Sequence, residues 1–106
     1  MERLTRKDLV IEMLTKEPND VFLNYALAME YLAVANYTQA ELQLQKVLSI
    51  APTYLPCFYQ LGQLKEKQAD NDAAIDYYEQ GVRLAKLQNN TKALGELKEA
   101  LWMLED

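Results

Sequence analysis

The chain has 106 residues, half of them apolar and a quarter charged, which is typical of a folded globular domain and not of a disordered or membrane protein. Its formal net charge of -5 would repel phosphate backbones and anionic lipids, so we expect no nucleic acid and no membrane as partners. One cysteine and no histidine exclude an internal disulfide and histidine-based metal sites, and we expect no metal and no cofactor.

The amino-terminal stretch MERLTRKDLV interleaves charged and apolar residues and therefore lacks the continuous apolar segment of a secretory signal. No apolar run elsewhere approaches the roughly 18 residues that a membrane span requires. We therefore expect a cytoplasmic location.

Helix-favouring residues dominate the whole chain, and there are only three glycines and three prolines, so we predict an all-α fold. Breaks near residues 17–20, 35–37, 51–53, 69–72 and 88–91 predict about six helices. The first, about residues 5–16, opens with Thr5 and Asp8, which form a weak version of a capping box.

Short oxygen-bearing side chains predict the starts of the later helices, because they can accept hydrogen bonds from first-turn amides. Pro56 falls in a first turn, where its missing N–H costs little. The closing helix, about residues 91–104, carries its leucines at the spacing of one buried stripe. The cap candidates are Asp20, the capping-box pair Thr38 and Glu41, Thr53, and Asp70 or Asn71; the stripe is Leu94, Leu97, Leu101 and Leu104.

The pattern repeats itself every 34 residues, beginning with Pro18 and Pro52. A second match, at 33 residues, relates QLGQLK at residues 60–65 to ALGELK at residues 93–98. The chain is therefore a half unit, two whole units and a further half unit. The positions in register include Val10, Leu44 and Tyr78; Leu14, Leu48 and Val82; Tyr25 and Tyr59; Leu27 and Leu61; and Ala40 and Ala74.

This 34-residue helix–turn–helix period resembles the tetratricopeptide repeat, whose first helix carries Trp-x2-Leu-Gly-x2-Tyr, whose second carries Ala-x3-Phe, and which closes with proline. Three positions depart from that pattern: Asn24 stands in place of the large aromatic residue, Lys65 in place of the tyrosine and Lys86 in place of the proline. The matching residues are Leu27, Ala28, Tyr31, Ala40, Leu44 and Pro52 in the first unit, and Phe58, Leu61, Gly62, Ala74 and Tyr78 in the second.

The resemblance implies one domain over residues 1–106, folded as a right-handed α-α superhelix (an alpha-alpha solenoid). It would contain a half repeat at about 5–20, repeat 1 at about 21–54, repeat 2 at about 55–88 and a capping helix at about 91–104. In this family the first helix of each repeat lines a concave groove that commonly holds a partner protein or peptide. The resemblance therefore implies a non-enzymatic module for protein–protein interaction, or scaffold.

Helix 21–34 is apolar on nearly every side, and by the family's geometry one of its flanks would face the groove. An exposed apolar patch of that size often marks an interaction site. We therefore predict that a partner peptide or helix binds there and along the matching positions of the second unit. The predicted partner-binding residues are Phe22, Tyr25, Met29 and Leu32, with Tyr59, Gln63 and Glu66; Pro56, Lys67, Lys92, Glu96 and Glu99 continue the groove.

Alternatives to a free groove stay open at this level. The apolar flank could be part of a wide core, or the chain's own tail could fold back onto it. A second copy of the chain could also cover it in a homodimer or larger homo-oligomer. Trp102 lies off the leucine stripe of the closing helix and is a candidate oligomer contact. Cys57 has no histidine to activate it and reads as a small buried side chain. No constellation of polar groups predicts catalysis.

Overall fold

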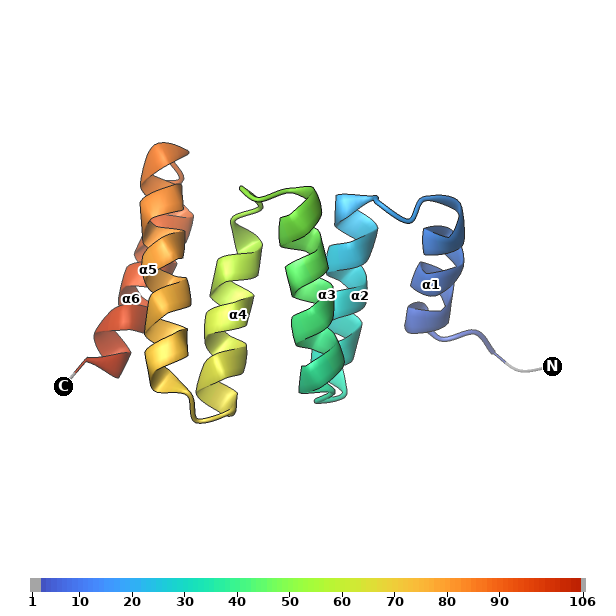
Figure 1. The fold of residues 1–106 in the computed structure, drawn as a ribbon, viewed down its shortest axis with the longest axis horizontal. Helices are drawn as coiled ribbons and strands as arrows, with labels where there is room; N and C mark the ends of the chain where they lie inside the picture. Colours follow the sequence, from blue (N-terminus) through green and yellow to red (C-terminus); the bar gives the residue numbers. More distant parts are fainter. Residues whose placement is uncertain (1–2, 106) are drawn as a thin grey trace. The chain divides into compact units, whose positions relative to one another are not determined.

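The computed structural model describes residues 3–105 and contains six α-helices and no strand in that range (Figure 1). The predicted all-α fold and the number of helices are confirmed. Residues 1, 2 and 106, which belong to the predicted domain, lie outside the described residues. The helices are α1 (Arg6–Lys16), α2 (Val21–Ala33), α3 (Tyr37–Ile50), α4 (Pro56–Lys67), α5 (Asn71–Leu87) and α6 (Thr91–Leu104).

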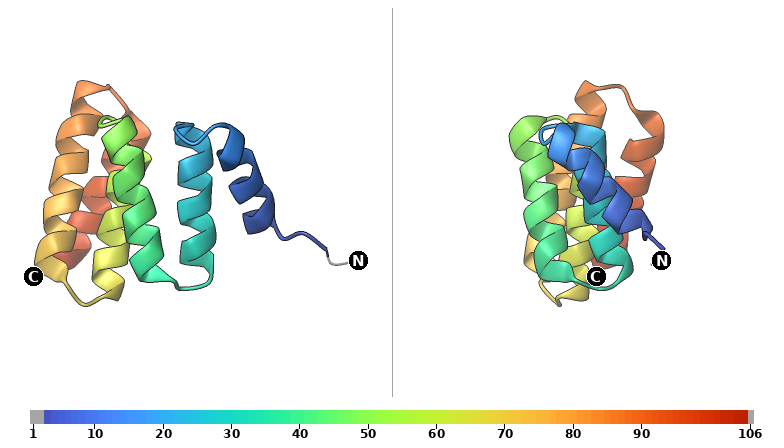
Figure 2. Two further views of the ribbon diagram at one scale, coloured as in Figure 1. Left: turned by 45° about the vertical axis from the view of Figure 1, so that its right-hand side comes forward. Right: turned by 90° about the vertical axis from the view of Figure 1, so that its right-hand side faces the viewer.

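The chain divides into two compact units, which we call unit 1 (Met1–Pro52) and unit 2 (Thr53–Asp106). In unit 1, α2 packs against both α1 and α3, and consecutive helices run in opposite directions (Figures 1 and 2). In unit 2, α5 packs against both α4 and α6 in the same alternating manner. The boundary between the units lies close to the predicted junction of repeats 1 and 2, whereas a single domain over the whole chain stays a prediction.

Four of the predicted helix starts are found in the structure. Thr5 and Asp8 form a reciprocal capping box, with both hydrogen bonds 3.1 Å long. A carboxylate oxygen of Asp20 accepts a 2.8 Å hydrogen bond from the amide of Leu23, and Asp70 caps α5 in the same way. The first residue of α4 is a proline, as predicted.

Two predicted caps were wrong. Asn36, and not Thr38, caps α3, because its side chain accepts the hydrogen bond from the Gln39 amide and α3 already begins at Tyr37. Thr38 and Glu41 therefore lie inside the helix and form no capping box. Thr53 does not cap α4, whose N-cap residue is Leu55, without a side-chain hydrogen bond.

The core of unit 2 depends on a close approach between α4 and α5 at Gly62. A Cβ atom at that glycine would lie 2.2 Å from the ring of Tyr78, which is fully buried. Ala74, one turn away on α5, is also fully buried. The small residues of the repeat pattern, such as Gly62 and Ala74, therefore lie at this helix crossing and leave space for the large residue of the neighbouring helix.

Unit 1 has a buried polar residue at its centre, where the sequence departs from the repeat pattern. Asn24 is fully buried, and its amide nitrogen donates to the carbonyl oxygens of Pro18 at 3.0 Å and Asp20 at 2.7 Å. Its side-chain oxygen accepts a 2.5 Å hydrogen bond from the amide of Gln43 on α3. The asparagine thus ties together the α1–α2 turn, α2 and α3 without leaving a buried polar atom unsatisfied.

Candidate functional site

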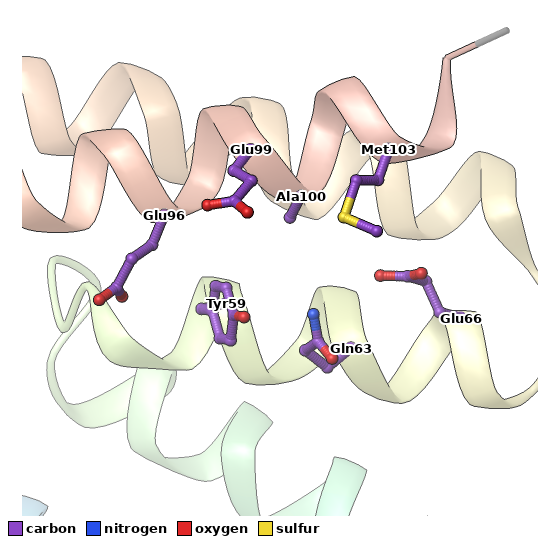
Figure 3. Close-up of a pocket in the computed structure, with 7 residues that line it drawn as sticks. All are labelled: Tyr59, Gln63, Glu66, Glu96, Glu99, Ala100 and Met103. Carbon is purple, nitrogen blue, oxygen red and sulfur yellow. The ribbon is translucent and has the colours of Figure 1, made fainter.

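Unit 2 contains a pocket of about 360 Å³ between α4 and α6, which we call the acidic pocket. Three of the predicted partner-binding residues, Tyr59, Gln63 and Glu66, form its α4 wall. Figure 3 shows their side chains opposite those of α6, across an open space. The α6 wall consists of Glu96, Glu99, Ala100 and Met103.

The lining of the acidic pocket combines negative charge with apolar surface. It holds three glutamates and no lysine or arginine, and neither Glu96 nor Glu99 forms a salt bridge within residues 3–105. The ring of Tyr59 and the thioether of Met103 provide flat and flexible apolar surfaces beside these carboxylates. Such a lining favours a group that is positively charged at its tip and apolar along its stem.

A buried tyrosine orients the α4 wall of the pocket. The hydroxyl of Tyr78 donates to the carboxylate of Glu66 and accepts a 2.9 Å hydrogen bond from the amide of Gln63. Burial raises the pKa of Tyr78, and the neighbouring Glu66 raises it further, so the hydroxyl stays protonated and remains a donor. Glu66 and Gln63 are therefore held in place before any partner arrives.

The predicted apolar residues of α2 differ in exposure. Phe22 is 72% exposed, whereas Tyr25, Met29 and Leu32 are half-buried. On its other flank α2 meets α1, where Arg6 forms a 3.7 Å salt bridge with Glu30 and Lys7 lies 5.3 Å from the ring centre of Tyr31. The expected apolar patch is thus only partly open, and Phe22 is its most accessible member.

Phe22 lines a second hollow, of about 440 Å³, at the corner between α1 and α2. This hollow joins it to Met13 near the end of α1, and Met13 also lines a smaller depression, of about 320 Å³, with Leu9. Leu9 and Met13 are 48% and 55% exposed, and sequence reasoning missed them as surface residues. The repeat register gave no signal for this exposure, because Met13 matches Val47, which is fully buried on α3.

The remaining candidate residues are placed as follows. Trp102 is 74% exposed, in agreement with its predicted position away from the buried stripe of α6. Cys57 is fully buried, and burial raises the pKa of its thiol to about 12, which makes it a poor nucleophile. Among residues 3–105 there is no group of acidic or cysteine side chains arranged to hold a metal ion. The described helices include none that is both long and apolar enough to cross a membrane.

Comparison with known protein families shows which family this chain matches. The model of the tetratricopeptide repeat matches the chain twice, at residues 23–54 and 55–86. The chain belongs to the tetratricopeptide repeat family. Tetratricopeptide repeat domains are generally non-enzymatic modules for protein interaction.

Solved structures agree with this assignment. The solution structure of a tetratricopeptide repeat domain protein from Salinibacter ruber is 36% identical, with a TM-score of 0.78, over 83% of this chain and 89% of that one. A crystal structure of a Salinibacter ruber tetratricopeptide repeat domain protein is 35% identical, with a TM-score of 0.75, over 80% and 94% of the two chains. A Bordetella parapertussis protein shares the fold at 22% identity, with a TM-score of 0.87, over 96% and 89%. The comparison with curated proteins found no match.

The departures from the tetratricopeptide repeat pattern have local explanations. Asn24 replaces the usual aromatic residue and is satisfied by Gln43, which is the reason that the substitution is tolerated in a core position. Lys86 replaces the closing proline, and α5 continues to Leu87 with this lysine in its last turn. A positive side chain is favourable there, because the carboxyl end of a helix carries partial negative charge.

Proposed function

We propose that this tetratricopeptide repeat chain binds a peptide or helix of a partner protein through the first helices of its two repeats. On α2 the contact residues would be Phe22, Tyr25, Met29 and Leu32, and on α4 they would be Tyr59, Gln63 and Glu66. The proposal includes no catalytic step and no cofactor. A cytoplasmic location and a scaffold role are part of the same proposal.

The observation that carries the proposal is the acidic pocket of unit 2. Its α4 wall consists of residues predicted from the repeat pattern alone, and it is large enough to hold one long side chain of a partner. Because Glu66 and Gln63 are already fixed by Tyr78, little side-chain freedom is lost there on binding. The preferred partner segment carries a lysine or arginine next to an apolar residue.

Affinity capture from a lysate of the source cells tests the proposal with paired baits. One bait is the native chain, and a second carries Glu96→Gln and Glu99→Gln, which remove two charges from the pocket without changing its shape. A third bait carries Glu79→Gln and Asp76→Asn on exposed positions of α5 and serves as the matched control. A further bait with Phe22→Ala tests the α2 contact.

We expect at least one protein to be captured by the native and control baits and to be reduced about fivefold or more on the pocket variant. Loss of one or two charge-assisted contacts at a partly exposed site corresponds to about 1 kcal/mol, which is roughly fivefold in affinity. The captured protein should also bind the purified chain less tightly as salt is raised. The same set of proteins on all four baits would contradict the proposal.

A further inference from the structure

The first and last helices of the chain have the register of two complementary halves of a repeat. Residues 93–98 of α6 match residues 60–65 of α4, so α6 corresponds to a first helix. Val10 and Leu14 of α1 match Tyr78 and Val82 of α5, so α1 corresponds to a second helix. Within a repeat, a first and a second helix pack directly against each other, as α4 and α5 do in unit 2.

The contact between α4 and α5 shows which positions such a pair of helices uses. On α4, Gly62 leaves room for the Tyr78 ring, which a Cβ atom there would approach to 2.2 Å. On α5, a Cβ atom at Gly81 would lie 3.1 Å from the Cβ atom of Phe58. Gly62 therefore lies opposite Tyr78, and Phe58 lies opposite Gly81.

On α6 the equivalent surface is open. Gly95 stands where α4 has Gly62, yet a Cβ atom at Gly95 would meet, within 4 Å, no atom beyond its chain neighbours and the backbone of its own helix. Trp102 follows it after seven residues, two helical turns along the same side, and is 74% exposed. We call this surface the Gly95 face; its members, all exposed, are Thr91, Gly95, Lys98 and Trp102.

On α1 the surface that a first helix would cover is open at Met13, although Val10, the counterpart of Tyr78, is only 7% exposed in its own chain. Met13 occupies the position of Val47 on α3 and Gly81 on α5, both of which are buried. Met13 itself is 55% exposed, and Leu9, one turn earlier on the same side, is 48% exposed. We call this surface the Met13 face; its members are Leu9, Glu12, Met13 and Lys16, which line one shallow depression.

We propose that the Gly95 face of one copy of the chain docks on the Met13 face of a second copy, so that α6 and α1 complete a repeat across the contact. If α6 of one copy packs on α1 of the next in the way that α4 packs on α5, Gly95 lies opposite Val10, as Gly62 lies opposite Tyr78. In the same way, Thr91 lies opposite Met13, as Phe58 lies opposite Gly81. The two surfaces are different, so the contact is head-to-tail, and each added copy leaves one face of each kind free for another.

The repeat register, and not charge, argues for a second copy as the occupant. In unit 2 the ring centre of Tyr59 lies 6.1 Å from that of Tyr78, so the same packing would place Lys92 of one copy near Val10 of the next and would form no charge pair. Two helices of 11 and 14 residues meet in this contact. We expect a contact made by one helix from each copy to bury less than the roughly 1,200 Å² of a stable interface, so association should be weak and should depend strongly on concentration.

Sedimentation velocity of purified variants tests the proposal through complementation. Met13→Glu places a charge on the Met13 face, and Gly95→Glu fills the Gly95 face while replacing a helix-interior glycine by a better helix former. Both positions are open in the monomer, so the variants should keep the native circular dichroism spectrum and melting curve. Leu87→Glu, at a position 81% exposed on α5, adds the same charge away from both faces and is the control.

We expect the native and Leu87→Glu chains to form dimers and longer species as their concentration rises to about 1 mM, in the range where small interfaces associate. Each face variant alone should stay at the 12.2 kDa monomer. An equal mixture of the two face variants should form a dimer and nothing larger, because only one pair of intact faces remains. A native chain that stays monomeric throughout, a face variant that still self-associates, or a mixture that stays monomeric would each overturn the proposal.

Discussion

Replacing each of two matched glycines by alanine should have opposite effects on stability. Gly62 and Gly95 occupy equivalent positions of α4 and α6, 33 residues apart, and both lie inside a helix. An alanine in place of a helix-interior glycine gains about 0.8 to 1.0 kcal/mol from helix propensity. At Gly95 nothing opposes this gain, because no atom beyond its chain neighbours and the backbone of its own helix lies within 4 Å of the added Cβ atom.

At Gly62 the same methyl group collides with the core. It would lie 2.2 to 2.6 Å from three atoms of the Tyr78 ring, and that ring is fully buried and hydrogen-bonded at its hydroxyl to Gln63 and Glu66. Overpacking of a core costs about 1 to 3 kcal/mol, and displacement of the ring puts its hydrogen bonds, about 1 kcal/mol each, at risk. With one of these hydrogen bonds lost and the propensity gain of about 1 kcal/mol subtracted, we expect Gly62→Ala to destabilise the protein by about 1 to 3 kcal/mol.

Urea unfolding followed by circular dichroism at 222 nm measures both effects. It should be carried out at about 5 µM, well below the range in which a small interface would associate. The urea midpoint should rise for Gly95→Ala and fall for Gly62→Ala, with similar slopes. Equal shifts of the same sign would show that helix propensity alone governs these positions and would refute the steric argument at Tyr78.

Three further predictions follow from the buried and capping groups. Gln43→Leu removes the donor of the 2.5 Å hydrogen bond to the side-chain oxygen of fully buried Asn24. The free energy of unfolding, measured by urea titration, should fall by about 1 to 3 kcal/mol. No change would mean that this hydrogen bond contributes nothing to stability. Hydrogen bonds from Thr5 lower the pKa of Asp8, so the capping box stabilises α1 at any pH above the pKa that Asp8 has in the unfolded chain. This contribution is lost as pH falls through the lower pKa of Asp8 in the folded chain. The amide NMR shifts of α1 should therefore change on acid titration, and Asp8→Asn should remove that change. Cys57, with its pKa raised to about 12 by burial, should react with a thiol reagent at pH 8 at least about a hundredfold more slowly than in urea, and comparable rates would contradict its burial.

Most of the fold was predictable from sequence because its signals are local or strictly periodic. Helices, the fourth-helix proline and the small residues at crossings each follow from one position and its 34-residue counterpart. The capping residue of α3 could not be predicted from the sequence, because Asn36 and Thr38 both offer a side-chain oxygen that can cap a helix. Which of the two side chains caps α3 depends on the backbone at Ala35. Its left-handed φ of 57° ends the turn after α2 and places Asn36 at the N-cap position of α3.

The candidate sites show a similar limit. Tyr59 and Glu66 could be named from the repeat pattern, but the pattern does not give the spacing between α4 and α6 that adds Met103 to the same pocket. The degree of burial along α2 was also beyond the sequence, since Phe22 is open whereas Met29 is half-buried. Periodicity identifies which face a residue occupies, and only the neighbouring helices decide how far that face is covered.

Site-specific disulfide formation between copies tests most directly whether the repeat register also governs association. Phe58 and Gly81 are neighbours in unit 2, and their counterparts across the proposed contact are Thr91 of one copy and Met13 of the next. A chain with Thr91→Cys mixed with a chain with Met13→Cys should form a cross-linked heterodimer under mild oxidation, since buried Cys57 does not compete.

The control pairs Lys98→Cys with Met13→Cys, which moves one thiol about 10 Å along α6. We expect a heterodimer band on a non-reducing gel for the Thr91 pair and little for the Lys98 pair. Equal yields from the two pairs, or cross-linking mainly between identical chains, would contradict association in the repeat register.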